Sequence, residues 1–167
     1  MRPMKMNMMR GSHLPILMKL MSITTGPVLE LGSGLYSSPY LHWECARSNR
    51  RLVTYEGNED YSHWILKAAN DWHEVHYVTD WDKIDLTENW SIAFVDHAPA
   101  DRRGTDVARL LHADYVVCHD TENREFTKYN YHKVYKSFKY RWKYTDYIPC
   151  TSVWSKYHDV RNFRIAP

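Results

Sequence analysis

The chain has 167 residues, a formal net charge of +2 and a charged fraction of 25%. This length suffices for one domain with its own hydrophobic core, and so small a charge does not by itself indicate a polyanionic partner. No apolar run approaches the roughly 18 residues that a membrane-spanning helix needs, and three irregularly spaced cysteines favour a reducing cytoplasm over a disulfide scaffold.

The first 13 residues combine basic residues with methionines and lack a long apolar core, so they do not form a secretory signal. We expect a disordered or tag-like tail over residues 1–13, and Gly11-Ser12-His13 is consistent with a cloning scar. Residues 14–20 predict a short helix, which Thr24-Thr25-Gly26-Pro27 ends. A single domain is therefore expected over residues 14–167.

Five short apolar segments then predict buried strands, at residues 27–31, 52–56, 75–78, 91–95 and 114–118. Helical patterns separate them. Apolar residues at helical spacing mark one helix face over residues 61–69 and another around Val107, after a polar start at Asp101. This alternation predicts an α/β fold: a three-layer sandwich around a doubly wound, mostly parallel sheet of the Rossmann-like type.

The C-terminal part of the chain has a different pattern. From Phe138 to Tyr144, aromatic residues at every second position alternate with Lys and Arg. This alternation predicts a strand with one buried and one solvated face. After Pro149, residues 151–155 predict a second strand, and two strands joined so closely should pair antiparallel.

The segment from Lys128 to Tyr144 contains six Lys or Arg and no acid. Basic residues interleaved with aromatic ones can bind single-stranded nucleic acid. The strict alternation favours another explanation, in which the aromatic side chains fill the core and the cations keep the other face soluble and block edge pairing.

The first candidate site is a glycine turn. An apolar strand with Glu30 near its end leads into Gly32 and Gly34 and then into a helix, which is the general shape of a nucleotide-binding turn. Glycine lets the backbone turn sharply and lets a ligand approach without an intervening Cβ atom. A dinucleotide site would favour a third glycine at position 37, where this chain has Ser37, so an NAD-dependent oxidoreductase is disfavoured.

The segment Glu30-Leu-Gly-Ser-Gly34 resembles the first motif of class I S-adenosylmethionine (SAM)-dependent methyltransferases. In that family the glycines pass under the methionine and ribose portions of SAM. The resemblance implies the same role for Glu30, Gly32 and Gly34. It also implies that the turn is lined by Tyr36, Ser37 and Ser38.

Two more strand ends extend this resemblance. Glu56 ends the second strand, where an acid accepts hydrogen bonds from both ribose hydroxyls of SAM. Dinucleotide enzymes use an acid similarly, so Glu56 alone does not separate the two families. After the third strand, Asp80 and Trp81 fit the corner that holds adenine; a helix cap at Asp80 and a surface tryptophan are the alternatives.

Strand four runs into Asp96 and His97. Ligands of doubly wound sheets bind beyond the carboxyl ends of the strands, at the switch between the two halves. We expect Asp96 to accept from the methionine amino group of SAM. His97 is the candidate catalytic base for an acceptor hydroxyl, because the pKa of histidine lies near working pH; a histidine hydrogen-bonded in a strand-end turn is the alternative.

Asp96 together with Asp120, after strand five, resembles the metal-dependent O-methyltransferases of the catechol and cephalosporin-hydroxylase-like groups, although the neighbouring residues match only in part. That resemblance leaves open a magnesium ion bound by the two carboxylates. Arg102 and Arg103 follow the first of them. A guanidinium there could clamp a substrate carboxylate or phosphate; a solvated first helical turn is the alternative.

These features predict an enzyme that moves the methyl group of SAM to an oxygen or nitrogen nucleophile. The expected acceptor is a small molecule or a sugar, and the sequence does not identify it. The alternatives are a SAM-binding or nucleic-acid-binding module without transfer activity and, less favoured, an NAD-dependent oxidoreductase.

Overall fold

The computed structural model describes residues 8–165, which form a seven-stranded sheet in the order β3-β2-β1-β4-β5-β7-β6. Strands β1 to β5 run parallel, whereas β7 is antiparallel to both of its neighbours. The predicted mostly parallel sheet with an antiparallel C-terminal pair is confirmed. The strands are β1 (Val28–Leu31), β2 (Leu52–Glu56), β3 (His73–Tyr77), β4 (Ile92–Val95), β5 (Tyr115–Cys118), β6 (Tyr140–Tyr144) and β7 (Thr151–Ser155).

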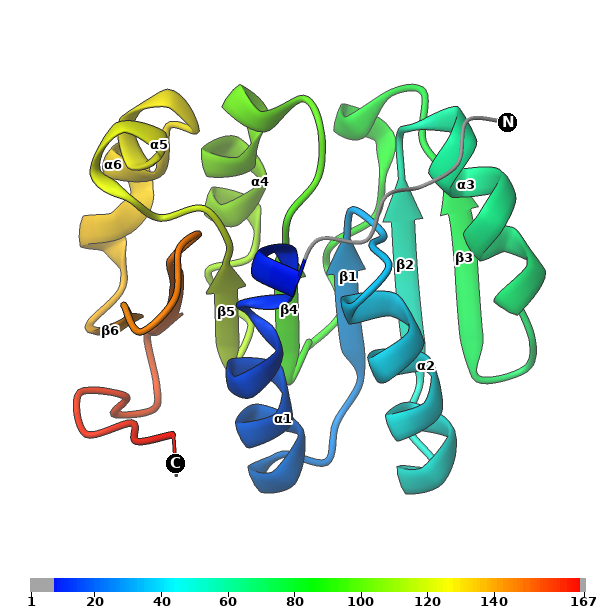
Figure 1. Ribbon diagram of the computed structural model, residues 1–167, viewed down its shortest axis with the longest axis horizontal. Helices are drawn as coiled ribbons and strands as arrows, with labels where there is room; N and C mark the ends of the chain where they lie inside the picture. The colour runs from blue at the N-terminus through cyan, green and yellow to red at the C-terminus, as the bar shows by residue number, and fades with distance from the viewer. Residues whose placement is uncertain (1–7, 166–167) are drawn as a thin grey trace.

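Helices cover both faces of this sheet and complete the predicted three layers (Figure 1). One face carries α1 (Leu14–Ile23), α2 (Ser37–Ser48) and α3 (Glu59–Ile65). The opposite face packs against α4 (Arg103–Arg109) and α6 (Tyr131–Val134). The remaining helical segments are α5 (Asn123–Lys128) and the 3-10 turns η1 (Met8–Gly11), η2 (Leu66–Ala68), η3 (Trp81–Lys83), η4 (Ala100–Arg102) and η5 (Tyr135–Ser137).

The central strands read as continuous apolar runs because both of their faces are buried. In β1, Val28 packs with the α1 and α2 side chains, whereas Leu29 and Leu31 pack into the core under α4 and α6. None of these three side chains is exposed. A sheet sandwiched in this way leaves only its strand ends and loops free to form a ligand site.

Two predicted elements are shorter in the structure. The helix expected over residues 61–69 ends at Ile65 and continues only as a 3-10 turn, so Ala69 is exposed. The strand expected from Phe138 begins at Tyr140, and Phe138 instead fills the core under α6. The predicted buried face of β6 is also incomplete: it is an edge strand in which Tyr140 and Trp142 are half-buried.

The order of the strands creates a switch point between β1 and β4. From β1 the chain builds β2 and β3 on one side and then returns to place β4 on the other. The turn η1 and the start of α1 lie across the carboxyl ends of these central strands (Figure 1). Ser12 and His13 are buried there, only 5% and 3% exposed, so the packed domain begins before residue 14; residues 1–7 of the expected tail lie outside the described residues.

Within residues 8–165, no helix is long and apolar enough to cross a membrane.

Candidate cofactor-binding site

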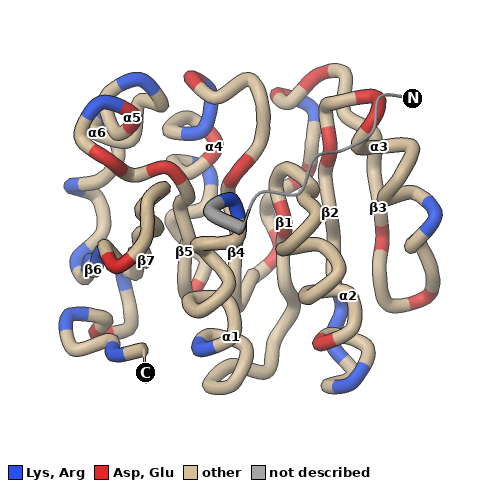
Figure 2. The backbone as a smooth tube through the Cα atoms, in the orientation of Figure 1, with Lys and Arg blue, Asp and Glu red and all other residues tan. Residues whose placement is uncertain are grey.

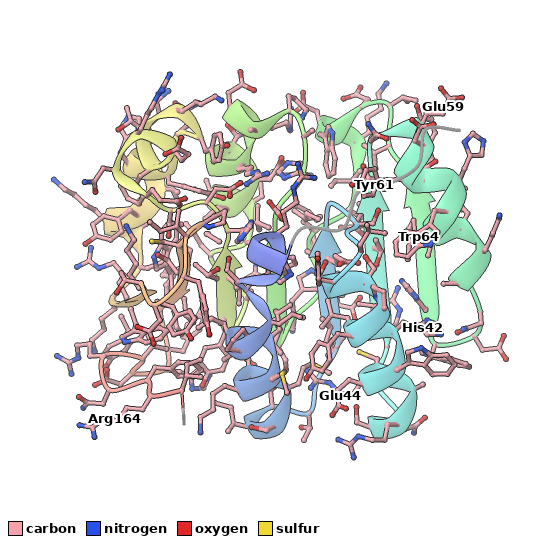
Figure 3. All side chains as sticks on the ribbon, viewed as in Figure 1. His42, Glu44, Glu59, Tyr61, Trp64 and Arg164 are labelled. Carbon is pink, nitrogen blue, oxygen red and sulfur yellow. The ribbon has the colours of Figure 1, made fainter. Side chains whose placement is uncertain are left out.

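A cavity of about 250 Å³ lies at the carboxyl ends of β1, β2 and β4. The glycine turn at residues 32–37 forms one wall, and residues 96–98 form another. Tyr61 projects from α3 toward the same space (Figure 3). The predicted residues Gly32, Gly34, Tyr36 and Ser37 are thus brought together with Glu56 and Asp96 around one cavity.

Gly32 is the position in this turn that only glycine fits. Its φ of +89° is one that other residues rarely adopt. A Cβ atom at this position would lie 2.6 Å from the Cα of His97 and 2.7 Å from the carbonyl carbon of Asp96. The missing side chain therefore lets the two strand ends of the switch point approach each other closely.

Glu30 supports the glycine turn from behind and does not line the cavity, which corrects the expected direct contact with cofactor. Its side chain is fully buried and accepts hydrogen bonds from the hydroxyls of Ser38, at 2.9 Å, and Thr54, at 2.8 Å. The Gly34 N–H donates to Ser38 Oγ at 2.9 Å, so this serine links Glu30 to the turn and is itself behind the wall. Burial raises the pKa of Glu30 to about 7.

Glu56, the expected ribose-binding residue, does line the cavity. The N–H and hydroxyl of Ser33 donate to its Oε2 atom at 2.6 and 2.7 Å, and the Asn58 N–H donates to Oε1 at 2.6 Å. A carboxylate offers about four lone-pair positions, so one position stays open, and rotation of the Ser33 hydroxyl would free a second. This arrangement suits a ligand with two adjacent hydroxyls.

Asp80 and Trp81 lie outside the cavity wall. Asp80 accepts the Asp82 N–H at 3.0 Å and pairs with Lys83 at 3.1 Å, so it caps η3. Trp81 is buried, with its ring centroid 4.1 Å from that of His97. Asp80 therefore does not lie with the other site residues. Trp81 packs against His97 and does not line the cavity.

Arg103 bridges the two carboxylates that were candidate magnesium ligands. Its guanidinium lies 2.8 Å from Asp96 Oδ1 and 2.8 Å from Asp120 Oδ2. Burial would lower the pKa of Arg103, but the charge of Asp96 raises it, so the group stays cationic. A fixed cation already neutralises this pair, and the two residues do not fit a shared magnesium site. Because its guanidinium is paired with these two carboxylates, Arg103 does not fit the expected role of binding a substrate carboxylate or phosphate.

Asp96 has a second partner in His119, whose Nδ1 atom lies 3.2 Å from Oδ2. Burial would raise the pKa of Asp96, but the charges of His119 and Arg103 outweigh it and hold that pKa below its ordinary value. In the same way, burial would lower the pKa of His119, but the charge of Asp96 raises it. Asp96 is therefore an ionised carboxylate at the edge of the cavity.

His97 has its ring turned away from the open cavity. Its side chain is fully buried, and Nε2–H donates to Asp106 Oδ2 at 2.8 Å. Burial lowers the pKa of His97, although Asp106 opposes that shift. The Nδ1 atom is also buried and has no hydrogen-bond partner among the described residues, so the observed contacts fit the alternative of a histidine hydrogen-bonded in a strand-end turn. Arg102 also contacts Asp106, at 3.0 Å, and Asp82, at 2.6 Å, rather than the cavity.

The N-terminal segment also contributes to the cavity, although its sequence does not indicate this. Arg10 and His13 form part of the cavity wall. Burial, with a smaller contribution from the charge of His119, lowers the pKa of His13 to about 3. No apolar pattern marks this segment. The contribution of Asn58 was more visible, since an asparagine before Glu59 and Asp60 is typical of a helix N-cap, and its side chain does accept the Tyr61 N–H at 3.1 Å.

Comparisons with solved structures identify the same architecture. The chain is similar to cofactor-bound Rv0187 from MTB, with a TM-score of 0.63 and 13% identity over 94% of this chain and 84% of that one. The N-terminal domain of human METTL16 in complex with SAH gives 0.64 and 11%, over 94% and 74%. SAH-bound Podospora anserina methyltransferase PaMTH1 gives 0.63 and 10%, over 90% and 79%.

The fold is a class I SAM-methyltransferase fold. At these identities the likeness concerns the fold alone, and the catechol-type resemblance receives no support from it. No protein-family model matches the sequence, and no curated protein matches it. Within the class I fold, the cavity at the β1–β4 switch point is where doubly wound sheets bind their ligands.

Proposed function

We propose that this chain binds SAM in the cavity at the β1–β4 switch point and transfers its methyl group to an oxygen or nitrogen nucleophile. The observation that carries the proposal is the meeting of Gly32, Glu56 and Asp96 around one cavity of a class I fold. These three residues lie at the carboxyl ends of three separate strands. Their convergence therefore depends on the strand order rather than on any single motif.

The cavity residues fit the chemistry of SAM. Gly32 and Gly34 both line the cavity, and glycine lets a ligand approach the backbone closely. Glu56 offers a carboxylate for the two ribose hydroxyls. The hydroxyl of Tyr36 is buried and has no hydrogen-bond partner among residues 8–165, so it is free to bind a ligand group.

SAM, when bound, supplies a methyl group on a sulfonium, which is a strong electrophile. The protein then needs mainly to orient the reacting groups and exclude water. Gly32 and Gly34 support the cofactor, and Glu56 orients its ribose. Ionised Asp96 binds the amino group at the methionine end, while His97 positions the loop that carries Asp96 by anchoring it to α4.

We propose a small molecule or a sugar as the acceptor, since none of the seven aromatic residues of the basic C-terminal segment is fully exposed; four of them, including Tyr140 and Trp142, are half-buried. Figure 2 shows the Lys and Arg over α5, α6 and β6 at one end of the molecule. Tyr131, Phe138 and Tyr144 of this segment are buried, whereas Lys133 and Lys136 are exposed. Stacking on bases needs exposed rings, so this surface does not favour nucleic acid.

Calorimetric titration with SAH tests this proposal and separates it from the NAD alternative. We expect micromolar binding of SAH and no binding of NAD at the same concentrations. Absence of SAH binding by the folded protein would overturn the proposal. A screen of acceptors with SAM carrying a labelled methyl group would then separate a transferase from a module that only binds: transfer to any small-molecule acceptor supports the enzyme.

A further inference from the structure

Three side chains of types that commonly bind metal ions lie close together at the edge of the cavity. His13 precedes α1, Asp96 follows β4, and His119 follows β5. Their candidate ligand atoms all lie within 4.8 Å of one another. We propose that His13, Asp96 and His119 form a binding site for a divalent transition metal of the zinc type.

His13 provides the first independent observation for this site. It is only 3% exposed, and neither ring nitrogen has a hydrogen-bond partner among the described residues. Buried polar groups in proteins are nearly always paired, and an unpaired one lowers stability. Coordination of an ion would give one of the two unpaired ring nitrogens of His13 a partner.

His119 is held as histidine ligands usually are, with its second nitrogen fixed by a hydrogen bond. Its Nε2 atom lies 3.0 Å from Ser12 Oγ. The Ser12 hydroxyl donates its proton to the carbonyl of Pro149 at 2.6 Å, so Ser12 Oγ must accept from Nε2–H. This bond orients the ring and turns Nδ1 toward Asp96 Oδ2.

The carboxylate of Asp96, like the ring of His119, has one of its two polar atoms held by another residue. Arg103 binds Oδ1, while Oδ2 faces His119. Carboxylates that bind metals are commonly fixed by such a bond to the other oxygen. Two of the three residues therefore each have one atom held by the protein and the other directed toward the proposed ion.

The ligand set selects the class of ion. Two imidazoles with one carboxylate suit zinc and other divalent transition metals, whereas magnesium prefers ligands that are all oxygen atoms. Bonds of about 2.0–2.1 Å place tetrahedral ligands roughly 3.4 Å apart, so small side-chain shifts would close the cluster around zinc.

The fourth position would face the cavity, because His13 and Asp96 both line it. If the proposed function holds, a hydroxyl or carboxylate oxygen of the acceptor is the group that this position would take. Metal binding itself does not depend on that function.

The test uses the full chain, stripped of metal with a chelator and then dialysed. Zinc is titrated by calorimetry, and cobalt by its visible absorption, which reports the coordination geometry. We expect one ion per chain. His13→Ala should weaken zinc binding at least tenfold, whereas His132→Ala, at an exposed histidine of α6, should leave it unchanged. Equal zinc affinity in these two variants would overturn the proposal, as would a stoichiometry well below one.

A second variant guards against a folding defect in the first. Ser12→Ala keeps all three ligands and removes only the partner of His119, so we expect zinc affinity to fall about tenfold, within the range known for such supporting residues. Unchanged affinity would contradict the orientation argued for His119. Circular dichroism checks the fold of each variant. SAH titration in chelator tests the proposed function separately, so failure of one proposal is distinguishable from failure of the other.

Discussion

The Nε2 atom of His97 lies 2.8 Å from Oδ2 of Asp106, and neither side chain is exposed. Asp106 also binds Arg102, at 3.0 Å, and Arg109, at 2.9 Å. Burial would raise the pKa of Asp106, but the hydrogen bonds from His97 and Arg102 hold it below its ordinary value. This carboxylate therefore joins α4 to the loop that carries the candidate site.

We predict that Asp106→Ala lowers the free energy of unfolding by about 3–5 kcal/mol, because it leaves buried polar partners without their acceptor. Urea denaturation followed by circular dichroism measures this change. Asp101→Ala is the matched control: Asp101 is exposed, so its loss should change stability by less than about 0.5 kcal/mol. Similar small losses in both variants would show that the buried carboxylate does not hold the loop.

Gly32→Ala should both destabilise the chain and abolish SAH binding. The added Cβ would meet backbone atoms of Asp96 and His97 at under 3.0 Å, and these cannot move as a flexible side chain can. The expected loss of stability is about 1–3 kcal/mol from the strained φ alone. In Gly34→Ala the nearest atom is Ser37 Oγ, at 3.3 Å, so thermal unfolding should be much less affected. A Gly32 variant that melts like the wild type would contradict the described turn.

Glu56→Ala should weaken SAH binding at least tenfold, since paired hydrogen bonds to a charged acceptor contribute about 1.5–3 kcal/mol each. Calorimetry gives the affinity. Glu59→Ala, an exposed residue in the first turn of α3, is the control and should bind as the wild type does. Equal affinities for the two variants would mean that Glu56 only braces Ser33 and Asn58 and does not hold the ribose.

The sequence predicted the parts of the candidate site that lie at the carboxyl ends of strands. Gly32, Glu56 and Asp96 each come at the end of an apolar run, and parallel strands bring their carboxyl ends to one edge of the sheet. Local pattern and strand order are sufficient to place such residues together. For the same reason the sheet itself could be predicted, with errors at the edge strand β6, which begins at Tyr140 rather than Phe138 and is incompletely buried at Trp142.

The remaining features depend on contacts between distant segments. His13 belongs to a segment without apolar periodicity, and only the packed structure shows that it reaches the cavity. In the sequence, Arg103 looks like a substrate-binding residue. Its bridge between Asp96 and Asp120 joins two strand ends and becomes visible only in the structure. Neither hydrophobic pattern nor motif spacing specifies which of several nearby charged groups will pair.

Glu30 should make stability depend on pH in the direction opposite to that of an ordinary salt-bridged acid. Burial raises its pKa from the ordinary value of 4.5 to about 7, so the folded state keeps a proton that the unfolded state releases between these values. The folded state then binds more protons, and the free energy of unfolding falls as pH rises. This stabilisation is fully present below pH 4.5 and is lost as pH passes through about 7.

Glu30→Gln isolates this effect, because an amide still accepts hydrogen bonds from Ser38 and Thr54 but does not titrate. We expect the variant to gain about 3 kcal/mol relative to the wild type between pH 4.5 and about pH 8, as measured by urea denaturation across that range. Glu59→Gln, at an exposed glutamate, should follow the wild-type curve. If the difference between Glu30→Gln and the wild type is independent of pH, Glu30 is ionised in the folded protein and the burial argument for this residue is wrong.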